Sequence, residues 1–190
     1  NQAGAGAIVS SSDWILLVDA PASLTLGGLT PSFYQYAFSG SLASTGDAVL
    51  YRIAPTANVT IGAVTKSYDG TTTALLNNSN TTVTGLLGSD QWTLDGVYAT
   101  KNAGTGIAVT GSNFQVTNGG APVYGYAVNS PISGFGDITR AILSAAIIRN
   151  PTKNYKRTDT VSLTSANFDL VGVAAGEVLT INGALSAAYD

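Results

Sequence analysis

The chain has 190 residues, of which 45% are apolar and only 10% charged, and its net charge is −3. The sequence has no basic patch, so we expect no nucleic-acid binding, and it has no run of about 18 apolar residues, so we expect no membrane span. Because it contains neither Cys nor His, we expect no catalysis by a thiol or a histidine. Thr, Ser, Asn and Gly must form the polar surface, and this composition predicts an all-β protein. The absence of Cys and His predicts that the protein is not an enzyme, and we expect no cofactor or metal.

The first 57 residues are expected to form a β-rich connector. The opening NQAGAGA lacks the charged and apolar segments of a signal peptide, which suggests a fragment of something longer. The strongest aromatic cluster, Phe33–Phe38, has apolar residues on both faces of a strand, which favours burial between modules. The alternative is a ligand platform, for which the candidate residues are Tyr34, Tyr36, Tyr124 and Tyr126.

Residues 58–144 are expected to form one β-module, a small sandwich or open barrel. Alternating runs separated by turn residues at intervals of about 8–12 residues are typical of such folds. The one helix-compatible run is Thr139–Ile148, for which its β-branched residues favour a strand. The expected strands are NVTIGAVTKSY, TTVTGLL, QWTLDGVYAT, GIAVTGSNFQVTN, PVYGYAVNS and DITRAILSAAII.

The first turn of this module is predicted at Tyr68-Asp69-Gly70. Gly70 can adopt a positive φ, Asp69 can accept a hydrogen bond from nearby backbone, and the Tyr68 ring is expected to cover the end of the module. A metal or sugar contact is the alternative, although one carboxylate falls far short of the oxygen ligands that calcium needs. A second loop, Lys101–Gly106, lacks the phosphate-loop pattern and is predicted to be a hairpin connection.

An internal repeat appears when the sequence is shifted by 87 residues, which aligns Lys66 with Lys153. A fixed period of this kind indicates tandem modules. We therefore expect residues 145–190 to be the first half of a second, truncated module. Further matches in the same register are Ile61/Ile148, Tyr68/Tyr155, Thr71/Thr158, Thr73/Thr160, Asn80/Asn167, Gly85/Gly172, Thr93/Thr180 and Gly96/Gly183.

Four motifs occur in order, VTKSYDGTTTA, GSDQWTL, YATKNAGTGIAVTG and VYGYAVNSPISGFGDIT. Together they resemble the YDG module of large bacterial surface exoproteins of the filamentous-haemagglutinin type. The preceding SSDWILLVDAPASLTLGGLTPSFYQYAFSG resembles the segment that joins their upstream β-helix to such modules. The second copy departs from the pattern, since Lys156 and Arg157 stand where Asp69 and Gly70 do, which argues against a ligand role shared by all copies.

The resemblance implies a structural or adhesive stalk segment, secreted or on the bacterial surface, that serves attachment or biofilm cohesion. Its expected partners are the adjacent modules of the same polypeptide. The alternative is a carbohydrate-binding module that recognises a surface or biofilm polysaccharide, or a host-surface glycan.

Overall fold

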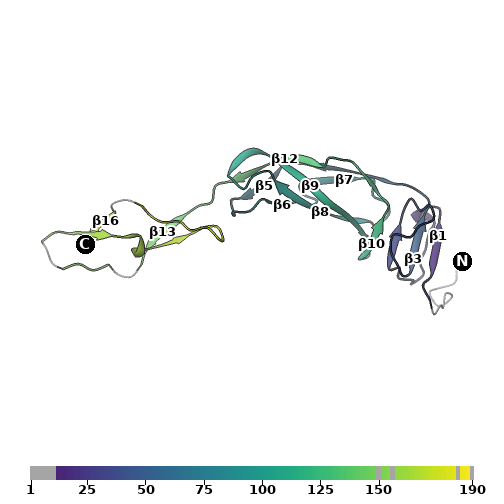
Figure 1. Ribbon diagram of the computed structural model, residues 1–190, viewed down its shortest axis with the longest axis horizontal. Helices are drawn as coiled ribbons and strands as arrows, with labels where there is room; N and C mark the ends of the chain where they lie inside the picture. The colour runs from purple at the N-terminus through teal and green to yellow at the C-terminus, as the bar shows by residue number, and fades with distance from the viewer. Residues whose placement is uncertain (1–11, 149–150, 155–156, 183–184, 189–190) are drawn as a thin grey trace.

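The computed structural model describes residues 12–148, 151–154, 157–182 and 185–188. Figure 1 shows an elongated molecule in which an N-terminal unit, a central unit and a C-terminal unit follow one another along the long axis. The described residues form strands and two short 3-10 turns, so the predicted all-β fold is confirmed. None of their helices is long and apolar enough to cross a membrane.

The N-terminal unit contains three short parallel strands, β1 (Ile15–Val18), β2 (Phe33–Gln35) and β3 (Ala48–Tyr51), in the order β1-β3-β2. A 3-10 turn, η2 (Pro21–Ser23), follows β1. All four residues of β3 are buried, as expected for the central strand of a parallel sheet that is covered on both faces. The aromatic residues of the unit pack on these two faces.

The central unit is a sandwich of two unequal layers. Its strands are β4 (Thr56–Ile61), β5 (Val64–Ser67), β6 (Thr73–Leu75), β7 (Thr81–Thr84), β8 (Gln91–Tyr98), β9 (Gly104–Asn118), β10 (Ala121–Tyr124), β11 (Ala127–Val128) and β12 (Ser133–Thr139). The small layer has the order β11-β4-β7, and β6, β8, β9, β12 and β5 belong to the large one. Their inward side chains form one core, because β4 and β8 bury alternate residues.

The long strand β9 organises the large sheet. It pairs with β8 along one side, and on its other side with β12 near its start and with β10 near its end. Because β10 also pairs in parallel with β2, the N-terminal and central units share one nine-stranded sheet. The predicted boundary at residue 57 therefore falls between two units that are joined by backbone hydrogen bonds.

The C-terminal unit consists of two antiparallel strand pairs. β13 (Ser144–Ile147) pairs with β15 (Phe168–Val171), and β14 (Thr160–Leu163) pairs with β16 (Leu185–Ala188). The 3-10 turn η3 (Ser165–Asn167) precedes β15. β13 confirms that a strand, and not a helix, forms within Thr139–Ile148.

Several contacts of the central unit recur in the C-terminal unit at positions related by the 87-residue shift or, in the first strand region, by one residue less. Lys66 Nζ donates to both the carbonyl and hydroxyl oxygens of Thr71, and Lys153 Nζ donates to the same two oxygens of Thr158. Gly85 has a φ of +87°, and a Cβ there would lie 2.0 Å from the Thr56 carbonyl oxygen. At Gly172 the φ is +95°, and a Cβ would lie 2.2 Å from the Ile142 carbonyl oxygen.

The strand register corrects the sequence alignment by one residue. In the central unit Ile61 pairs with Thr81, whereas in the C-terminal unit Ile147 pairs with Phe168. Ile61 thus corresponds to Ile147 and not to Ile148, because the second copy has one extra residue between its first strand and Lys153. Tyr155 and Lys156, which align with Tyr68 and Asp69, lie outside the described residues.

Arg157 occupies the position that corresponds to Gly70 and also has a positive φ, of 58°. An arginine here adopts a left-handed conformation that strains most residues other than glycine.

Candidate functional site: two inter-unit contacts and an aromatic groove

The Tyr68-Asp69-Gly70 stretch joins β5 to β6, but these strands are not partners. β5 pairs with β12 and β6 pairs with β8, so the chain turns a corner between two edges of the sheet instead of closing a hairpin. Gly70 has a φ of 77°, and Asp69 Oδ1 accepts hydrogen bonds from Thr71 N at 2.9 Å and from Lys66 Nζ at 2.7 Å. Hydrogen bonds from the Lys66 ammonium and from the Thr71 amide lower the pKa of the exposed Asp69 carboxyl to about 2.

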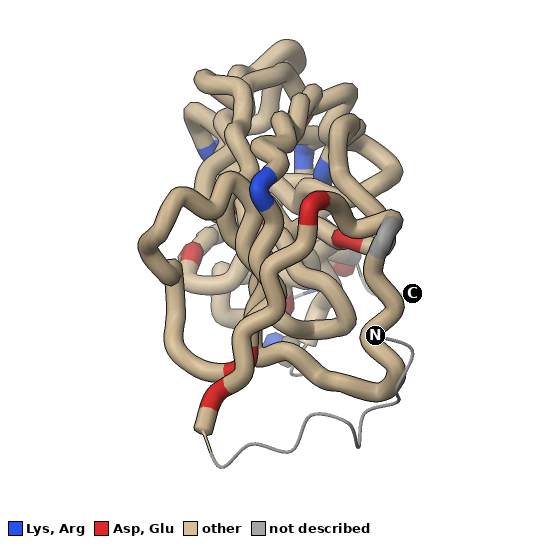
Figure 2. Tube along the Cα trace, turned by 90° about the vertical axis from the view of Figure 1, so that its right-hand side faces the viewer, with Lys and Arg blue, Asp and Glu red and all other residues tan. Residues whose placement is uncertain are grey.

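The Asp69 carboxylate is thus engaged within its own turn. Among the described residues no group of three or more His, Cys, Asp or Glu side chains could hold a metal ion. Figure 2 shows the acidic and basic residues of the described part of the chain scattered along the trace. The geometry of the turn is that of a structural corner.

Replacing Gly70 by valine should lower the free energy of unfolding of the central unit by about 1–2 kcal/mol, because a β-branched residue is strained at positive φ. Gly104→Val is the matched control, since a Cβ there would meet only the Ile107 side chain, at 3.6 Å. Urea unfolding followed by tryptophan fluorescence measures both variants. Equal losses for the two variants would contradict the structural assignment of the turn.

Tyr68 forms part of a contact between the central and C-terminal units. Its half-buried ring packs against the central core, and its hydroxyl donates to the Glu177 carboxylate. Lys101 Nζ, from the loop between β8 and β9, donates to the same Glu177 oxygen at 3.0 Å. That loop connects two antiparallel partners, as the predicted hairpin requires. The pKa of Glu177 is lowered by the Tyr68 hydroxyl first and by Lys101 second.

This contact should depend on pH. The folded pKa of Glu177 lies below its usual value, so the contact stabilises the docked units above the usual Glu pKa of about 4.3 and weakens as the pH falls through the lowered value. Single-molecule energy transfer between dyes at Ala63 and Ser162 should give one narrow distribution at neutral pH and a broader one in acid. Glu177→Gln should broaden the distribution at neutral pH already. A wild-type distribution that stays narrow in acid would oppose this role.

Asp90 organises the contact between the N-terminal and central units. Its Oδ2 accepts hydrogen bonds from the hydroxyls of Tyr36 at 3.0 Å and Tyr126 at 2.7 Å, and its Oδ1 accepts one from Asn118 Nδ2 at 2.7 Å. The Tyr126 hydroxyl also accepts from Leu87 N at 2.8 Å. Burial, reinforced by the nearby Asp90 charge, raises the pKa of Tyr36 and Tyr126.

The same contact includes packed rings. Tyr36 stacks on Tyr51 with ring centroids 4.9 Å apart and meets Tyr126 edge to face at 5.0 Å. Burial also raises the pKa of Tyr51 to about 12. Asp90 lies in the Gly-Ser-Asp step that carried the family resemblance, but the sequence did not indicate that its carboxylate would meet tyrosines from two units.

The structure divides the four tyrosines of the predicted ligand platform. Tyr34 and Tyr36 are only 8% and 2% exposed. The ligand-platform alternative is therefore wrong for these two residues, which belong to the core. Tyr126 is half-buried, and its hydroxyl is committed to Asp90. Tyr124 is 38% exposed and touches Phe33 edge to face at 6.1 Å.

A groove lies where β9 leaves β10. On one side of β9, β10 pairs with residues Val116–Asn118, and β12 pairs with residues from Gly104 to Thr110. Between them, residues Ser112–Gln115 of β9 have no strand partner on this side within residues 12–148. At Gly125, with a φ of 87°, the chain turns away from β10 toward β11. A Cβ at Gly125 would lie 2.2 Å from the Tyr36 carbonyl oxygen, so this turn requires glycine.

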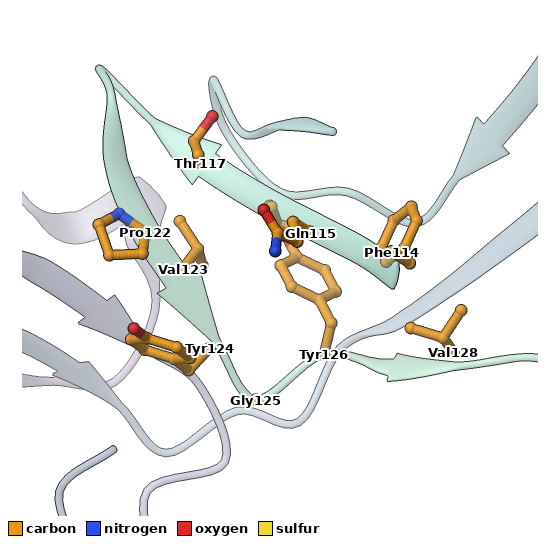
Figure 3. A pocket seen from close by; sticks show the side chains of 10 residues that line it. Phe114, Gln115, Thr117, Pro122, Val123, Tyr124, Gly125, Tyr126 and Val128 are labelled. Carbon is orange, nitrogen blue, oxygen red and sulfur yellow. The ribbon is translucent and has the colours of Figure 1, made fainter. Parts of the chain in front are cut away.

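The groove has a volume of about 330 Å³ and a mixed lining. Figure 3 shows the Phe114, Tyr124 and Tyr126 rings around it, with the Gln115 amide and Thr117 hydroxyl on β9. Aromatic rings and side chains that form hydrogen bonds can together bind a sugar. The remaining lining residues are Val116, Pro122, Val123, Gly125 and Val128.

Comparison with known families identifies a YDG domain at residues 53–133. Its bounds include the central strands from β4 to β11 and the first residue of β12. No curated protein and no solved structure matches the chain.

Proposed function

We propose that this chain is a stalk segment of a large bacterial exoprotein of the filamentous-haemagglutinin type, secreted or held at the cell surface, and that it serves attachment or biofilm cohesion. The observation that carries the proposal is the serial joining of β-units around a YDG domain. The nine-stranded sheet runs from the N-terminal unit into the central unit, which gives a stiff joint. Low charge and the lack of cysteine fit a chain that folds outside the cell without redox help.

The C-terminal unit is, in this proposal, a second copy of the same module. The contacts at Lys153, Gly172 and Asn167 support it, because each repeats one in the central unit. Thr164 N donates to Asn167 Oδ1 at 2.9 Å, as Asn77 N donates to Asn80 Oδ1 at 3.0 Å. Adjacent modules of the same polypeptide are then the principal partners.

Antibody labelling tests the proposed location. Antibodies raised against the purified chain should label intact cells that make the protein, or their culture medium, and should reduce biofilm formation when added during growth. Antibodies against an unrelated cytoplasmic protein are the control. Labelling only after the cells are made permeable would overturn the proposal.

The groove favours a second candidate function, carbohydrate binding to a surface or biofilm polysaccharide or a host glycan. Tyr124 is the test residue, because it is the most exposed of the four predicted tyrosines and lines the groove. Glycan-array binding should fall at least about tenfold in Tyr124→Ala, the loss expected when a stacking ring is removed. Phe135→Ala is the control, since that ring is 67% exposed on β12 outside the groove. Equal binding by both variants would exclude the groove as the site.

A further inference from the structure

The strands that begin the central unit pair in parallel with the strands that end it. β4 pairs with β11 through Thr56↔Ala127 and Ala57↔Val128. β5 pairs with β12 in an unbroken parallel register from Val64↔Gly136 to Ser67↔Thr139. The entry and the exit of the chain are therefore held together by parallel ladders.

This arrangement determines how tension along the chain would load the unit. Force enters at the N-terminal ends of β4 and β5 and leaves at the C-terminal end of β12. In a parallel pair these ends lie at opposite ends of the ladder, so the strands are pulled past one another. The hydrogen bonds of the ladder then resist together and not one after another. In Figure 1 β9 and β12 run close to the long axis of the molecule, along which a stalk carries load.

Further contacts strengthen both parallel pairs. The Tyr98 hydroxyl, on a ring only 1% exposed, donates to the Val64 carbonyl oxygen at 2.9 Å. Tyr68 N continues the β5–β12 ladder by donating to the Thr139 carbonyl oxygen at 2.8 Å. The Asn129 side chain extends the short β4–β11 pair, because its amide accepts from Val59 N at 2.6 Å and donates to Val59 O at 3.1 Å.

The C-terminal unit has the opposite geometry. β13 and β15 are antiparallel, and the first residue of β13, Ser144, pairs with the last of β15, Val171. The first residue of β14, Thr160, likewise pairs with Ala188 at the end of β16. Tension along the chain enters and leaves each pair at the same end, so its hydrogen bonds break in sequence.

We propose that the parallel pairs β5–β12 and β4–β11 form a mechanical clamp that keeps the central unit folded under tension, and that the C-terminal unit opens first and supplies extension. The proposal rests on the stalk function, since only a load-bearing chain uses such a clamp. The clamp is tested by pulling the purified chain, whereas the stalk function is tested by the location of the protein on cells. The failure of one proposal can therefore be distinguished from the failure of the other.

Optical-trap pulling on the full chain tests the clamp. The sequence contains no cysteine, so two engineered cysteines define the attachment points. Ala63→Cys with Arg140→Cys applies force to β5 and β12 at opposite ends, in shear. Ser67→Cys with Arg140→Cys applies force to the same pair at one end, as a zipper. All three positions are exposed, and melting curves matching wild type confirm that each double variant is folded.

The shear pair should unfold at a clearly higher force than the zipper pair at the same loading rate. Equal forces, or a lower force for the shear pair, would overturn the clamp. In the shear geometry Tyr98→Phe should lower the force, because the bond to Val64 is lost. Phe135→Ala, on the exposed side of β12, should leave it unchanged.

Pulling the chain from its two ends tests the predicted order of opening. The first event should occur at low force and release a length that matches the C-terminal unit, followed by the central unit at higher force. Gly172→Ala, which places a Cβ against the Ile142 carbonyl oxygen, should remove the first event and leave the second unchanged. A central unit that opens before the C-terminal unit would overturn the proposed order.

Discussion

Gly85→Ala should lower the free energy of unfolding of the central unit by about 3–5 kcal/mol, because the added methyl group combines backbone strain with a backbone clash. Gly85 follows β7 with a φ of +87°, and the added Cβ would lie 2.0 Å from the Thr56 carbonyl oxygen. That oxygen belongs to the backbone of β4, so the clash is relieved only if the small layer moves. Urea unfolding followed by tryptophan fluorescence measures the loss.

Gly88→Ala is the matched control for this variant. Gly88 also has a positive φ, of 58°, but a Cβ there would meet no atom within 4 Å. It should cost only about 1 kcal/mol, the strain of the backbone alone. A Gly85→Ala protein as stable as the Gly88→Ala protein would show that β4 and β7 do not approach as described.

Asp90→Ala should destabilise the joined N-terminal and central units by about 2–4 kcal/mol, because buried tyrosine hydroxyls lose their charged acceptor. Tyr36 is 2% exposed and donates to Asp90, as Tyr126 does. Asp90→Asn should lose less, since one acceptor oxygen remains. Differential scanning calorimetry measures the change.

Asp95→Ala is the control for the Asp90 variants. Asp95 is exposed on β8, and its carboxylate accepts from Asn113 Nδ2 at 3.0 Å. Its removal should cost well under 1 kcal/mol, as is usual for exposed polar contacts. A loss of stability for Asp90→Ala no larger than that for Asp95→Ala would show that ring packing alone stabilises the contact between the N-terminal and central units.

Local patterns predicted the strands and turns of this chain well. Alternation in QWTLDGVYAT correctly indicated a strand that buries every second residue. NVTIGAVTKSY was expected to be one strand, but the structure divides it into β4 and β5, which lie in different sheets. The Asp-Gly turn was predicted as a turn because glycine tolerates positive φ and Asp side chains bond to nearby backbone. These features depend on neighbours within a few residues, which a single sequence contains.

Contacts between distant segments could not be predicted in the same way. Nothing in the residues of β2 indicates β10 as its partner, and nothing around Glu177 indicates Tyr68. The groove arises from the points at which β10 and β12 stop pairing with β9, and no motif marks those points. The predicted ligand platform is wrong for Tyr34 and Tyr36, which are buried. Alternation in the sequence shows which residues share a strand face, but it does not show what covers that face.

The pairing of β2 with β10 also sets an order in time. As the chain is synthesised from its N-terminus, β1, β2 and β3 appear long before β10, and one edge of β2 then has no partner. Pairing between segments this distant in sequence is slow, and an open strand edge can recruit other chains while it waits. The local β8–β9 hairpin forms readily and brings β10 into place. We therefore expect the N-terminal unit to complete its sheet only together with the central unit, so that these strands, although synthesised before the central unit, are among the last to fold.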